Sequence, residues 1–210
     1  MKAGHVGTRS GGDILAVQVP DPLVRARLAA FLAELIKWNR AYNLTATRDA
    51  GEIVTRHVLD SLALLPLLHG RVLDVGSGAG FPAVPLALAR PDLDVTALDS
   101  NGKKARFLRH VQRTLEIPNL AIVESRVEHF RPAQPFDVVV SRAFGALGEF
   151  FALTKNLLAP AGEWVAMKGK LDSRELAGIP DDVEIREKRR LRVPGLDEER
   201  HAIIAAVKSK

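Results

Sequence analysis

The sequence predicts an α/β fold in which helices cover both faces of a mostly parallel, doubly wound sheet of seven strands. From about residue 70 onward, short apolar runs alternate with segments of helical periodicity, which is the pattern of such a sheet. The run at 136–141 is built on consecutive valines, as expected for a strand that is buried on both faces. A glycine-rich turn at 74–80 joins a strand to a helix, where α/β folds bind nucleotide-like ligands.

The part of the chain before this sheet is expected to be helical. Residues 1–20 are interpreted as a flexible start, because the first 13 residues contain four glycines and little apolar content. Residues 21–69 are interpreted as a helical appendage. Asp21 followed by Pro22 predicts a helix N-terminus, and apolar residues then recur at spacings of three and four to about Asn39.

A second helix is expected over 52–65. His57 and Asp60 lie three residues apart there, on neighbouring turns, so the two side chains can interact.

Residues 70–210 are interpreted as one ligand-binding domain. Its expected strands and helices alternate along the chain. The strands are expected at 72–75, 94–98, 120–124, 136–141 and 163–168, and the helices at 82–90, 101–116, 147–158 and 172–178. Ala161 and Gly162 are expected to form a turn. Two last strands, at about 183–192 and 200–207, are joined by a short turn and are expected to pair antiparallel at one edge.

The residues of the glycine turn discriminate between two ligand classes. A dinucleotide site has the pattern G-x-G-x-x-G/A, but here the third glycine comes one residue early and Phe81 replaces the small residue. Asp74 lies two residues before the first glycine, where it would repel a pyrophosphate and attract a cation. S-adenosylmethionine carries an ammonium group and a sulfonium and no phosphate. The turn therefore favours this methyl donor over a nicotinamide dinucleotide.

A second carboxylate supports the same interpretation. Asp99 ends the next expected strand, close to the roughly 20-residue separation at which such folds place a ribose-binding acid. A carboxylate there can accept hydrogen bonds from both ribose hydroxyls. The alternative is that the glycines serve packing alone and that Asp99 caps a helix.

Composition excludes several classes of protein and chemistry. The chain of 210 residues contains no cysteine, which excludes disulfides and thiolate chemistry. No apolar run approaches the ~20 residues of a membrane span, and the first residues lack the apolar core of a signal peptide. We therefore expect a cytoplasmic protein without a membrane partner. The net charge of +5 is compatible with a nucleic-acid partner.

Several motifs carry a resemblance to a known family from about Lys37 to the C-terminus. They are WNRAYNLT at 38–45, RHVLDS at 56–61, DVGSGAGFP at 74–82, LDS at 98–100, KKARFL at 103–108, SRVE at 125–128, SRAF at 141–144 and Lys168 followed by Gly169. In these motifs the chain resembles the bacterial 16S ribosomal RNA guanine-N7 methyltransferases, also called the glucose-inhibited division protein B family. It departs from the family's pattern at Ala83, where glycine is usual, and at Asn101 and Gly102.

The resemblance implies a class I, Rossmann-like methyltransferase that uses S-adenosylmethionine to methylate N7 of a guanine in 16S ribosomal RNA. Because N7 carries an unprotonated lone pair, no general base and no metal are expected. In-line placement of the reacting atoms can supply up to ~7–11 kcal/mol of the barrier reduction. The expected partner is 16S RNA in the 30S subunit or an assembly intermediate, and the protein is expected to be a monomer.

The resemblance and the turn together suggest a set of donor-binding residues. It consists of Asp74 at the amino-acid end of the donor, Gly76, Gly78 and Gly80 in the turn, Phe81 in the pocket wall, Asp99 with Ser100 at the ribose, Val127 and Glu128 at the adenine, and Arg142 between donor and target. Arg142 and Lys168 are expected to position the reacting groups. The alternative for Arg142 is a salt bridge at a helix end.

The target side is expected to bind RNA. The candidates are Asn39, Asn43, Thr45, His57, Lys103, Arg126 and Lys168, with basic runs at 103–109 and 186–192, and Tyr42, Phe81 or Phe144 as a stacking partner for the target base. The alternatives are local turn bonds for Asn39, Asn43 and Thr45, a hydrogen-bonded helix histidine for His57, and solvated faces for the basic runs.

Three other functions stay open at this point. They are methylation of a small molecule or a protein on the same fold, nicotinamide-dependent oxidoreduction, and RNA binding without catalysis. Phe81 and Asp74 argue against the second of these. The intact glycine turn and Asp99 argue against the third, because a protein without activity need not keep a donor pocket.

Overall fold

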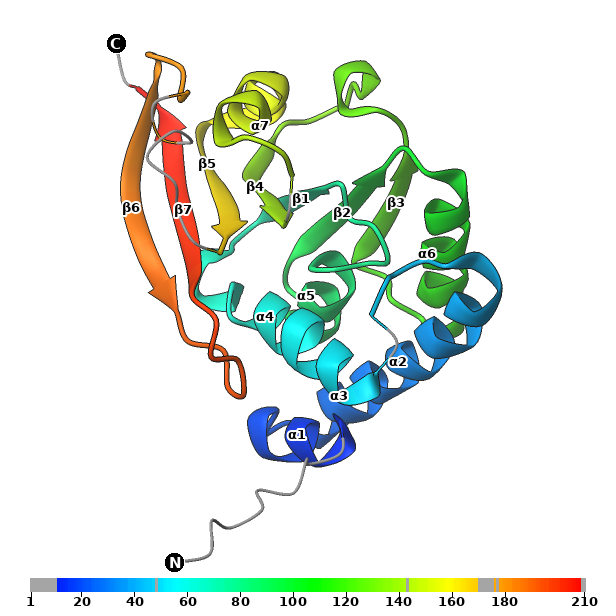
Figure 1. Ribbon diagram of the computed structural model, residues 1–210. Helices are drawn as coiled ribbons and strands as arrows, with labels where there is room; N and C mark the ends of the chain where they lie inside the picture. The colour runs from blue at the N-terminus through cyan, green and yellow to red at the C-terminus, as the bar shows by residue number, and fades with distance from the viewer. Residues whose placement is uncertain (1–10, 48, 143, 170–175, 177, 209–210) are drawn as a thin grey trace, which may run out of the picture.

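The computed structural model describes residues 11–208 except 48, 143, 170–175 and 177. Its centre is a seven-stranded sheet with the strand order β3-β2-β1-β4-β5-β7-β6 (Figure 1). The strands are β1 (Arg71–Val75), β2 (Asp94–Asp99), β3 (Leu120–Glu124), β4 (Phe136–Arg142), β5 (Leu158–Lys168), β6 (Val183–Leu191) and β7 (Arg200–Val207). The first five are parallel, and β7 pairs antiparallel with both β5 and β6. The predicted mostly parallel α/β sheet and its antiparallel edge are confirmed.

Helices cover both faces of this sheet. They are α1 (Gly11–Gln18), α2 (Pro22–Tyr42), α3 (Ala50–Ile53), α4 (Asp60–Leu62), α5 (Ala83–Ala89), α6 (Gly102–Thr114) and α7 (Leu147–Thr154). Single turns of other helix types are η1 (Val54–Leu59), η2 (Leu65–Leu67), η3 (Val127–His129) and η4 (Lys155–Leu157). No described helix is long and apolar enough to cross a membrane.

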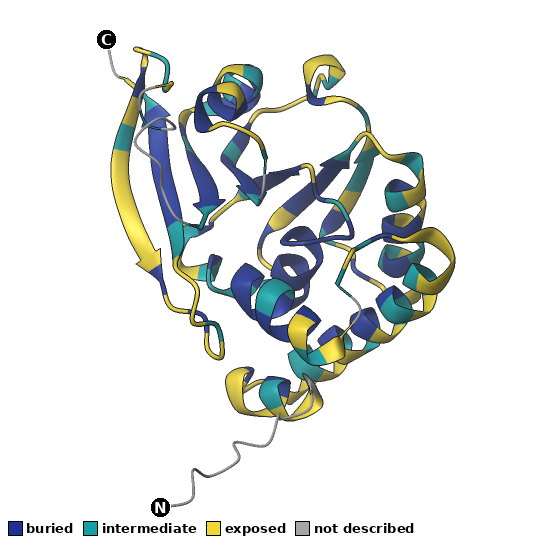
Figure 2. Ribbon diagram, viewed as in Figure 1, coloured by how far each residue is buried: buried dark blue, intermediate teal, exposed yellow. Residues whose placement is uncertain are grey.

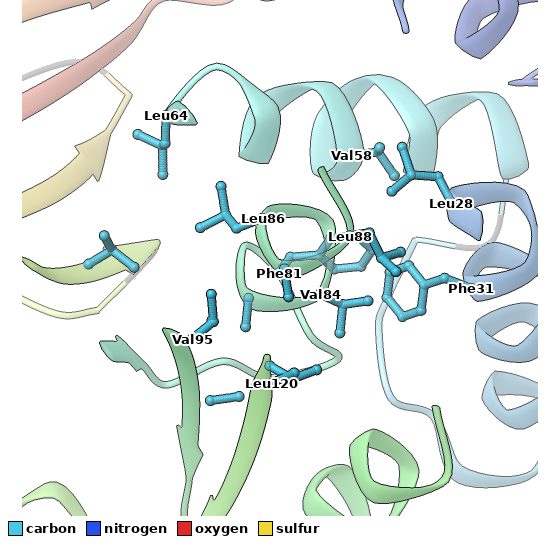
Figure 3. Close-up of a cluster of buried hydrophobic side chains, with 14 of the residues drawn as sticks. Leu28, Phe31, Val58, Leu64, Phe81, Val84, Leu86, Leu88, Val95 and Leu120 are labelled. Carbon is cyan, nitrogen blue, oxygen red and sulfur yellow. The ribbon is translucent and has the colours of Figure 1, made fainter. Parts of the chain in front are cut away.

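Alternating strand residues feed two separate cores. Val138 and Val140 of β4 belong to the core shared with α2, α5 and α6, whereas Val139 between them belongs to the core shared with α7. This alternation follows from the two-residue repeat of a strand. Figure 3 shows the first core, where Phe31 of α2 approaches Phe81 and the side chains of α5. The N-terminal helices are thus packed on the sheet domain through a continuous core.

The N-terminal segment begins with a helix that the sequence does not predict. Helix α1 covers residues that we expect to be flexible, and its Leu15 and the following Val19 are buried in the first core. Helix α2 starts as predicted, because the Asp21 side chain accepts hydrogen bonds from the backbone N–H groups of Leu23 and Val24. It ends at Tyr42, three residues beyond the expected end.

The helix expected over 52–65 is interrupted by a π-helix. The chain passes from α3 through the six-residue π-helix η1 into α4. A π-helix has more residues per turn than an α-helix, so the side chains that follow it are rotated relative to a continuous α-helix. Asp60 and Ser61, directly after η1, are both buried. Such insertions are frequent at functional sites.

The C-terminal half differs from the expectation in one strand. The turn predicted at Ala161 and Gly162 lies inside β5 as an irregularity, since Phe136 pairs with Leu158 but Val138 pairs with Glu163. The helix expected over 172–178 falls largely on residues outside those described. Strand β6 forms the outer edge and is mostly exposed (Figure 2). Its charged side chains are typical of an edge strand that does not pair with another chain.

The second core contains a buried polar pair that gives a stability prediction. The fully buried indole N–H of Trp164 donates a hydrogen bond to Oγ1 of Thr154 at 2.8 Å. Thr154→Val keeps the volume but leaves this N–H without an acceptor, so the free energy of unfolding should fall by roughly 1–3 kcal/mol. Urea denaturation measures the change, and Thr114→Val on the exposed end of α6 is the control. Equal stability of both variants would contradict the assigned hydrogen bond.

Candidate functional site

The glycine turn between β1 and α5 depends on its glycines for two different reasons. Gly76, Gly78 and Gly80 all have positive φ, at 75°, 58° and 101°. A Cβ on Gly80 would lie 2.8 Å from the side chains of both Leu108 in α6 and Val84 in α5. This glycine is therefore also required for close packing against these two helices. At Gly76 and Gly78 no atom would lie closer than 3.8 Å. These two positions therefore leave room for a ligand to approach the backbone.

Four backbone N–H groups of the turn are already hydrogen-bonded. Those of Gly76 and Ser77 both donate to the carbonyl oxygen of Leu98, at 2.8 and 3.1 Å, and that of Gly80 donates to the carbonyl of Ser77 at 2.8 Å. The N–H of Gly78 donates to Oδ2 of Asp99 at 2.8 Å. A phosphate-binding turn needs such N–H groups directed at its ligand. The conformation of this turn thus opposes pyrophosphate binding.

Asp74 is fully buried beneath the turn instead of lining it. Its Oδ2 accepts a hydrogen bond from the N–H of Ala83 at 3.0 Å, at the start of α5. Its Oδ1 has no hydrogen-bond partner within the described part of the chain. Burial raises the pKa of Asp74 to about 7, against the opposing effects of the Ala83 N–H and of Arg142. A carboxyl group thus occupies the helix N-terminus where dinucleotide-binding folds place the pyrophosphate.

One pocket, here called the glycine-turn pocket, opens at the carboxyl ends of β1, β2 and β3. It is lined by Val75, Gly76, Leu98, Asp99, Ser100, Ser125, Arg126, Val127, Glu128, Phe144, Glu149 and Leu153. Seven residues expected from the sequence meet here: Gly76, Asp99, Ser100, Arg126, Val127, Glu128 and Phe144. Arg126 and Phe144 are expected on the target side, but the structure places both in this pocket. Asp74, Gly78, Gly80 and Phe81 are not in its lining. They lie behind or beside the pocket and shape the turn.

Asp99 connects the pocket to the turn. Besides the bond from Gly78, its Oδ1 accepts a hydrogen bond from the N–H of Asn101 at 2.8 Å. Lys104 Nζ lies 3.9 Å from Oδ2. The N-cap of α6 is Asn101, so capping by Asp99 is not required there. Lys103 is exposed on α6 and does not line the glycine-turn pocket.

A second pocket, here called the cationic pocket, lies between the α3–η1–α4 segment and the ends of β4, β5 and β7. It is lined by Thr47, Glu52, Arg56, His57, Asp60, Arg142, Met167, Lys168, Gly169 and Arg200. His57, Arg142 and Lys168 are expected from the sequence. Arg200 is not, because no local signal marks it and only the antiparallel return of β7 brings it to this end of the sheet.

Arg142, at the end of β4, is the central cation of this pocket. Its Nη1 donates a hydrogen bond to the carbonyl oxygen of Arg56 at 2.8 Å and lies 3.6 Å from Oδ2 of Asp60. Its guanidinium carbon lies 5.5 Å from the centroid of the Phe81 ring, within cation–π distance. Burial lowers the pKa of Arg142, and the carboxylates of Asp60 and Asp74 oppose that effect. Arg142 therefore forms an ion pair, as the alternative interpretation expects, and it also lines the cationic pocket.

Asp60 and His57 do not interact with each other as the sequence suggests. Oδ1 of the buried Asp60 lies 3.3 Å from Nε of Arg200, in an ion pair. Burial raises the pKa of Asp60, and Arg142 and Arg200 lower it.

His57 has different neighbours. Its Nε2 lies 3.2 Å from Oγ1 of Thr47, and its ring centroid lies 5.1 Å from that of Phe81. Burial, followed by the charge of Arg142, lowers the pKa of His57 to about 4. The imidazole is therefore neutral at pH 7 and is a weak base.

Lys168 connects the two pockets. Its Nζ donates hydrogen bonds to the carbonyl oxygens of Gly145 and Phe144, at 2.6 and 3.4 Å. These bonds hold the segment after β4 near the end of β5. Phe144 in this segment lines the glycine-turn pocket, whereas Lys168 and Arg142 line the cationic pocket. The two pockets are thus neighbours across the end of β4.

The polar residues after α2 mainly hold their own loop. Oδ1 of Asn39 accepts a hydrogen bond from the N–H of Thr45 at 2.9 Å, and Asn43 is the left-handed cap of α2. Neither asparagine lines the cationic pocket, and Asn39 lines a separate one. Oγ1 of Thr45 accepts a hydrogen bond from the N–H of Thr47, which does line the cationic pocket. The turn-bond alternative thus describes Asn39 and Asn43 well.

The combined site can bind and orient two ligands but offers little acid–base chemistry. Among the described residues, no group of three or more His, Cys, Asp or Glu side chains is arranged to hold a metal ion. The glycine-turn pocket presents Asp99 and Glu128 to a ligand, and the cationic pocket presents Arg142 and Arg200. Two neighbouring pockets of this kind suit the transfer of a group from a nucleoside-like molecule in one pocket to an electron-rich acceptor in the other.

Comparisons with known proteins agree with this geometry. The family model "GidB: rRNA small subunit methyltransferase G" matches residues 25–204. The chain is 50% identical to the ribosomal RNA small subunit methyltransferase G of Laribacter hongkongensis over 190 residues, which cover 90% of each chain. It is 49% identical to the protein of that name from Pseudomonas aeruginosa over 196 residues, which cover 92% of this chain and 91% of the relative.

Solved structures show the same fold at lower identity. TrmN from Thermus thermophilus has a TM-score of 0.55 at 18% identity, covering 74% of this chain and 53% of TrmN. The N-methyltransferase NodS from Bradyrhizobium japonicum has a TM-score of 0.53 at 16% identity, covering 73% and 95% of the two chains. The family match and the close relatives span most of the sequence, and the chain therefore belongs to the rRNA small subunit methyltransferase G family.

Proposed function

We propose that this protein transfers the methyl group of S-adenosylmethionine to N7 of a guanine in 16S ribosomal RNA. The observation that carries the proposal is the junction of the two pockets at the end of β4, in a chain of this methyltransferase family. One pocket suits the methyl donor and the other suits an electron-rich acceptor. The proposal places the enzyme in the cytoplasm, acting as a monomer on the 30S subunit or an assembly intermediate.

The donor side of the proposal rests on the turn and on the two acids beside it. Bound S-adenosylmethionine supplies a methyl group on a sulfonium, which is a good leaving group. Asp99 would accept hydrogen bonds from the ribose, Val127 and Glu128 would border the adenine, and Gly76 would let the backbone approach closely. Asp74 would favour the donor's ammonium group from below the turn. Because its Oδ1 is buried and unpartnered, it is placed to accept a hydrogen bond, directly or through water.

The acceptor side needs orientation more than proton transfer. Guanine N7 has a free lone pair, so the neutral His57, with a pKa of about 4, is not required as a base. Arg142 and Lys168 would position the guanine and the segment that carries Phe144. Of the three candidate stacking residues, Phe81 is buried and Tyr42 packs on Trp38, whereas Phe144 lines the glycine-turn pocket. We therefore propose Phe144 as the stacking partner of the target base.

A row of basic residues supports an RNA backbone as part of the substrate. Lys168, His201 and Arg190 are paired directly across β5, β7 and β6, so they share one face of the sheet. Lys188 lies two residues before Arg190 on the same face. The neighbouring Arg186 and Arg189 form ion pairs with Glu163 and Glu187 instead. The row runs from Lys168, which lines the cationic pocket, to the sheet edge on the face of the second core, where it could follow phosphates.

Product analysis tests the proposed function directly. Incubation with radiolabelled donor and separate samples of naked 16S RNA, 30S subunits and total protein should label the RNA or the subunit. Nuclease digestion should then yield 7-methylguanine. Label found only in protein, or in small molecules, would overturn the RNA substrate. Titration with NADH is the control for the dinucleotide alternative, and no saturable binding is expected because the turn N–H groups are occupied.

Asp99→Ala should weaken donor binding strongly. The variant removes the ribose acceptor and also frees the N–H groups of Gly78 and Asn101 that shape the turn. We expect the donor dissociation constant in calorimetry to rise about tenfold or more, which corresponds to ~1.4 kcal/mol. Asp94→Ala, which removes an exposed carboxylate from the other end of β2, is the matched control. An unchanged constant for Asp99→Ala would rule out its role.

Asp74 should make donor binding depend on pH. Its pKa of about 7 in the free protein means that it is largely protonated at pH 6 and largely ionised at pH 8. The donor's ammonium favours the ionised form, so binding at pH 6 must first release a proton. The dissociation constant should therefore rise roughly three- to tenfold from pH 8 to pH 6. Asp74→Asn should bind more weakly at pH 8 and lose this dependence, whereas an unaltered pH profile would contradict the assignment.

A further inference from the structure

Asp60 joins three parts of the chain that are distant in sequence. It follows the π-helix η1, and its two carboxylate oxygens face different arginines. Oδ2 lies 3.6 Å from Nη1 of Arg142 at the end of β4, and Oδ1 lies 3.3 Å from Nε of Arg200 at the start of β7. The carboxylate is only 2% exposed, so water can do little to replace either arginine. Both contacts are ion pairs and not hydrogen bonds, because Oδ1 has no hydrogen-bond partner among the described residues and Oδ2 lies beyond hydrogen-bond distance of Nη1. The charge of Asp60 therefore restrains both guanidinium groups electrostatically.

The restraint on Arg142 matters for how an arginine recognises guanine. A free guanidinium typically donates two hydrogen bonds to guanine, one to O6 and one to N7. In a reaction at N7 such a fork would occupy the lone pair that must attack the methyl group. The N7 lone pair forms the new C–N bond, the electrons of the broken S–C bond stay on sulfur, and no proton moves. A productive site must therefore recognise guanine while leaving N7 free.

The geometry of Arg142 meets this requirement. Its Nη1 already donates to the carbonyl oxygen of Arg56 at 2.8 Å and faces Asp60 on the same side. The backbone of Arg56 belongs to the π-helix η1, and its side chain forms ion pairs with Glu52 and Glu198, at 2.9 and 2.6 Å. One arm of the guanidinium is thus engaged inside the protein. The face of the group is packed over Phe81, which further limits its rotation.

We propose that Asp60 is a positioning residue for Arg142. Together with the Arg56 carbonyl, it holds one arm of the Arg142 guanidinium. The guanidinium then donates a hydrogen bond to O6 of the target guanine and leaves N7 free. This inference rests on the proposed function, because it concerns methylation at N7. It assigns Asp60 a role without contact to substrate or donor. Arg200 serves the arrangement by holding the second carboxylate oxygen.

The first test uses the wild-type protein and altered RNA. Once the methylated guanine is located, 16S RNA ligated from fragments is prepared with 7-deazaguanine or 6-thioguanine at that position. The first analogue removes the N7 acceptor, and the second weakens the O6 acceptor. We expect 7-deazaguanine to change the RNA dissociation constant by less than about twofold and 6-thioguanine to raise it roughly threefold or more.

The outcomes separate this inference from the proposed function. If unmodified RNA yields no 7-methylguanine, the proposed function fails and the inference fails with it. If unmodified RNA is methylated but 7-deazaguanine weakens binding as much as 6-thioguanine does, only the inference is overturned. Because this test needs no variant, it does not depend on how a substitution affects folding.

The second test uses Asp60→Asn, which keeps the shape of the side chain and removes its charge. The freed guanidinium could then fork over O6 and N7, so kcat should fall about tenfold or more while RNA binding is retained. The donor dissociation constant should stay within about threefold, and 7-deazaguanine should now weaken RNA binding. Asp60→Glu, which keeps the carboxylate, should recover part of kcat.

The control is Asp94→Asn, which removes a carboxylate of the same type from an exposed pair with Arg71. Its kcat should equal that of the wild type. An unchanged kcat in Asp60→Asn would overturn the inference. A parallel loss of donor affinity, RNA affinity and melting temperature would also overturn it, because that result would assign Asp60 a purely structural role.

Discussion

The proposed preference for a cationic ligand depends on the hydrogen bond from the N–H of Ala83 to the buried carboxyl group of Asp74. This bond places an acidic group at the start of α5, where other α/β folds bind phosphate. The turn above it is closed by bonds from Gly76 and Ser77 to the carbonyl of Leu98, so few donors are directed outward. A cationic donor without phosphate is compatible with this arrangement, and a dinucleotide is not.

The N-terminal segment completes the cationic pocket at the end of β4. Its helices share a core with α5 and α6, and the π-helix η1 turns His57 and Asp60 toward the end of β4. From the opposite direction, the antiparallel strand β7 brings Arg200 to the same place. The cationic pocket therefore exists only where the N-terminal segment, β4 and β7 meet. The glycine-turn pocket, in contrast, is built from the ends of β1 and β2, the segments that follow the parallel strands, and α7.

The distribution of charge in the site matches a reaction without proton transfer. His57 is neutral because of its burial and the nearby Arg142. The buried carboxylate of Asp60 instead forms ion pairs with two partly buried arginines, Arg142 and Arg200. Buried pairs of this kind are costly to separate, so they hold their side chains in fixed orientations. Orientation is the main contribution that a methyl transfer to a free lone pair requires.

The sequence by itself determined the fold class, the order of the strands along the chain, the glycine turn and Asp99 of the glycine-turn pocket. These features depend on local patterns, since alternation, turn chemistry and strand ends are all visible within a few residues. Glu128 of this pocket came from the family motifs, and only the structure places Glu149 there. The family motifs also added Arg142 and His57. Tertiary structure alone decided that Asp74 lies beneath the turn, that a π-helix interrupts the second helix, and that Asp60 pairs with Arg142 and Arg200. Those contacts join residues 82 and 140 positions apart, and only the packing of the N-terminal segment and β7 against the sheet brings them together.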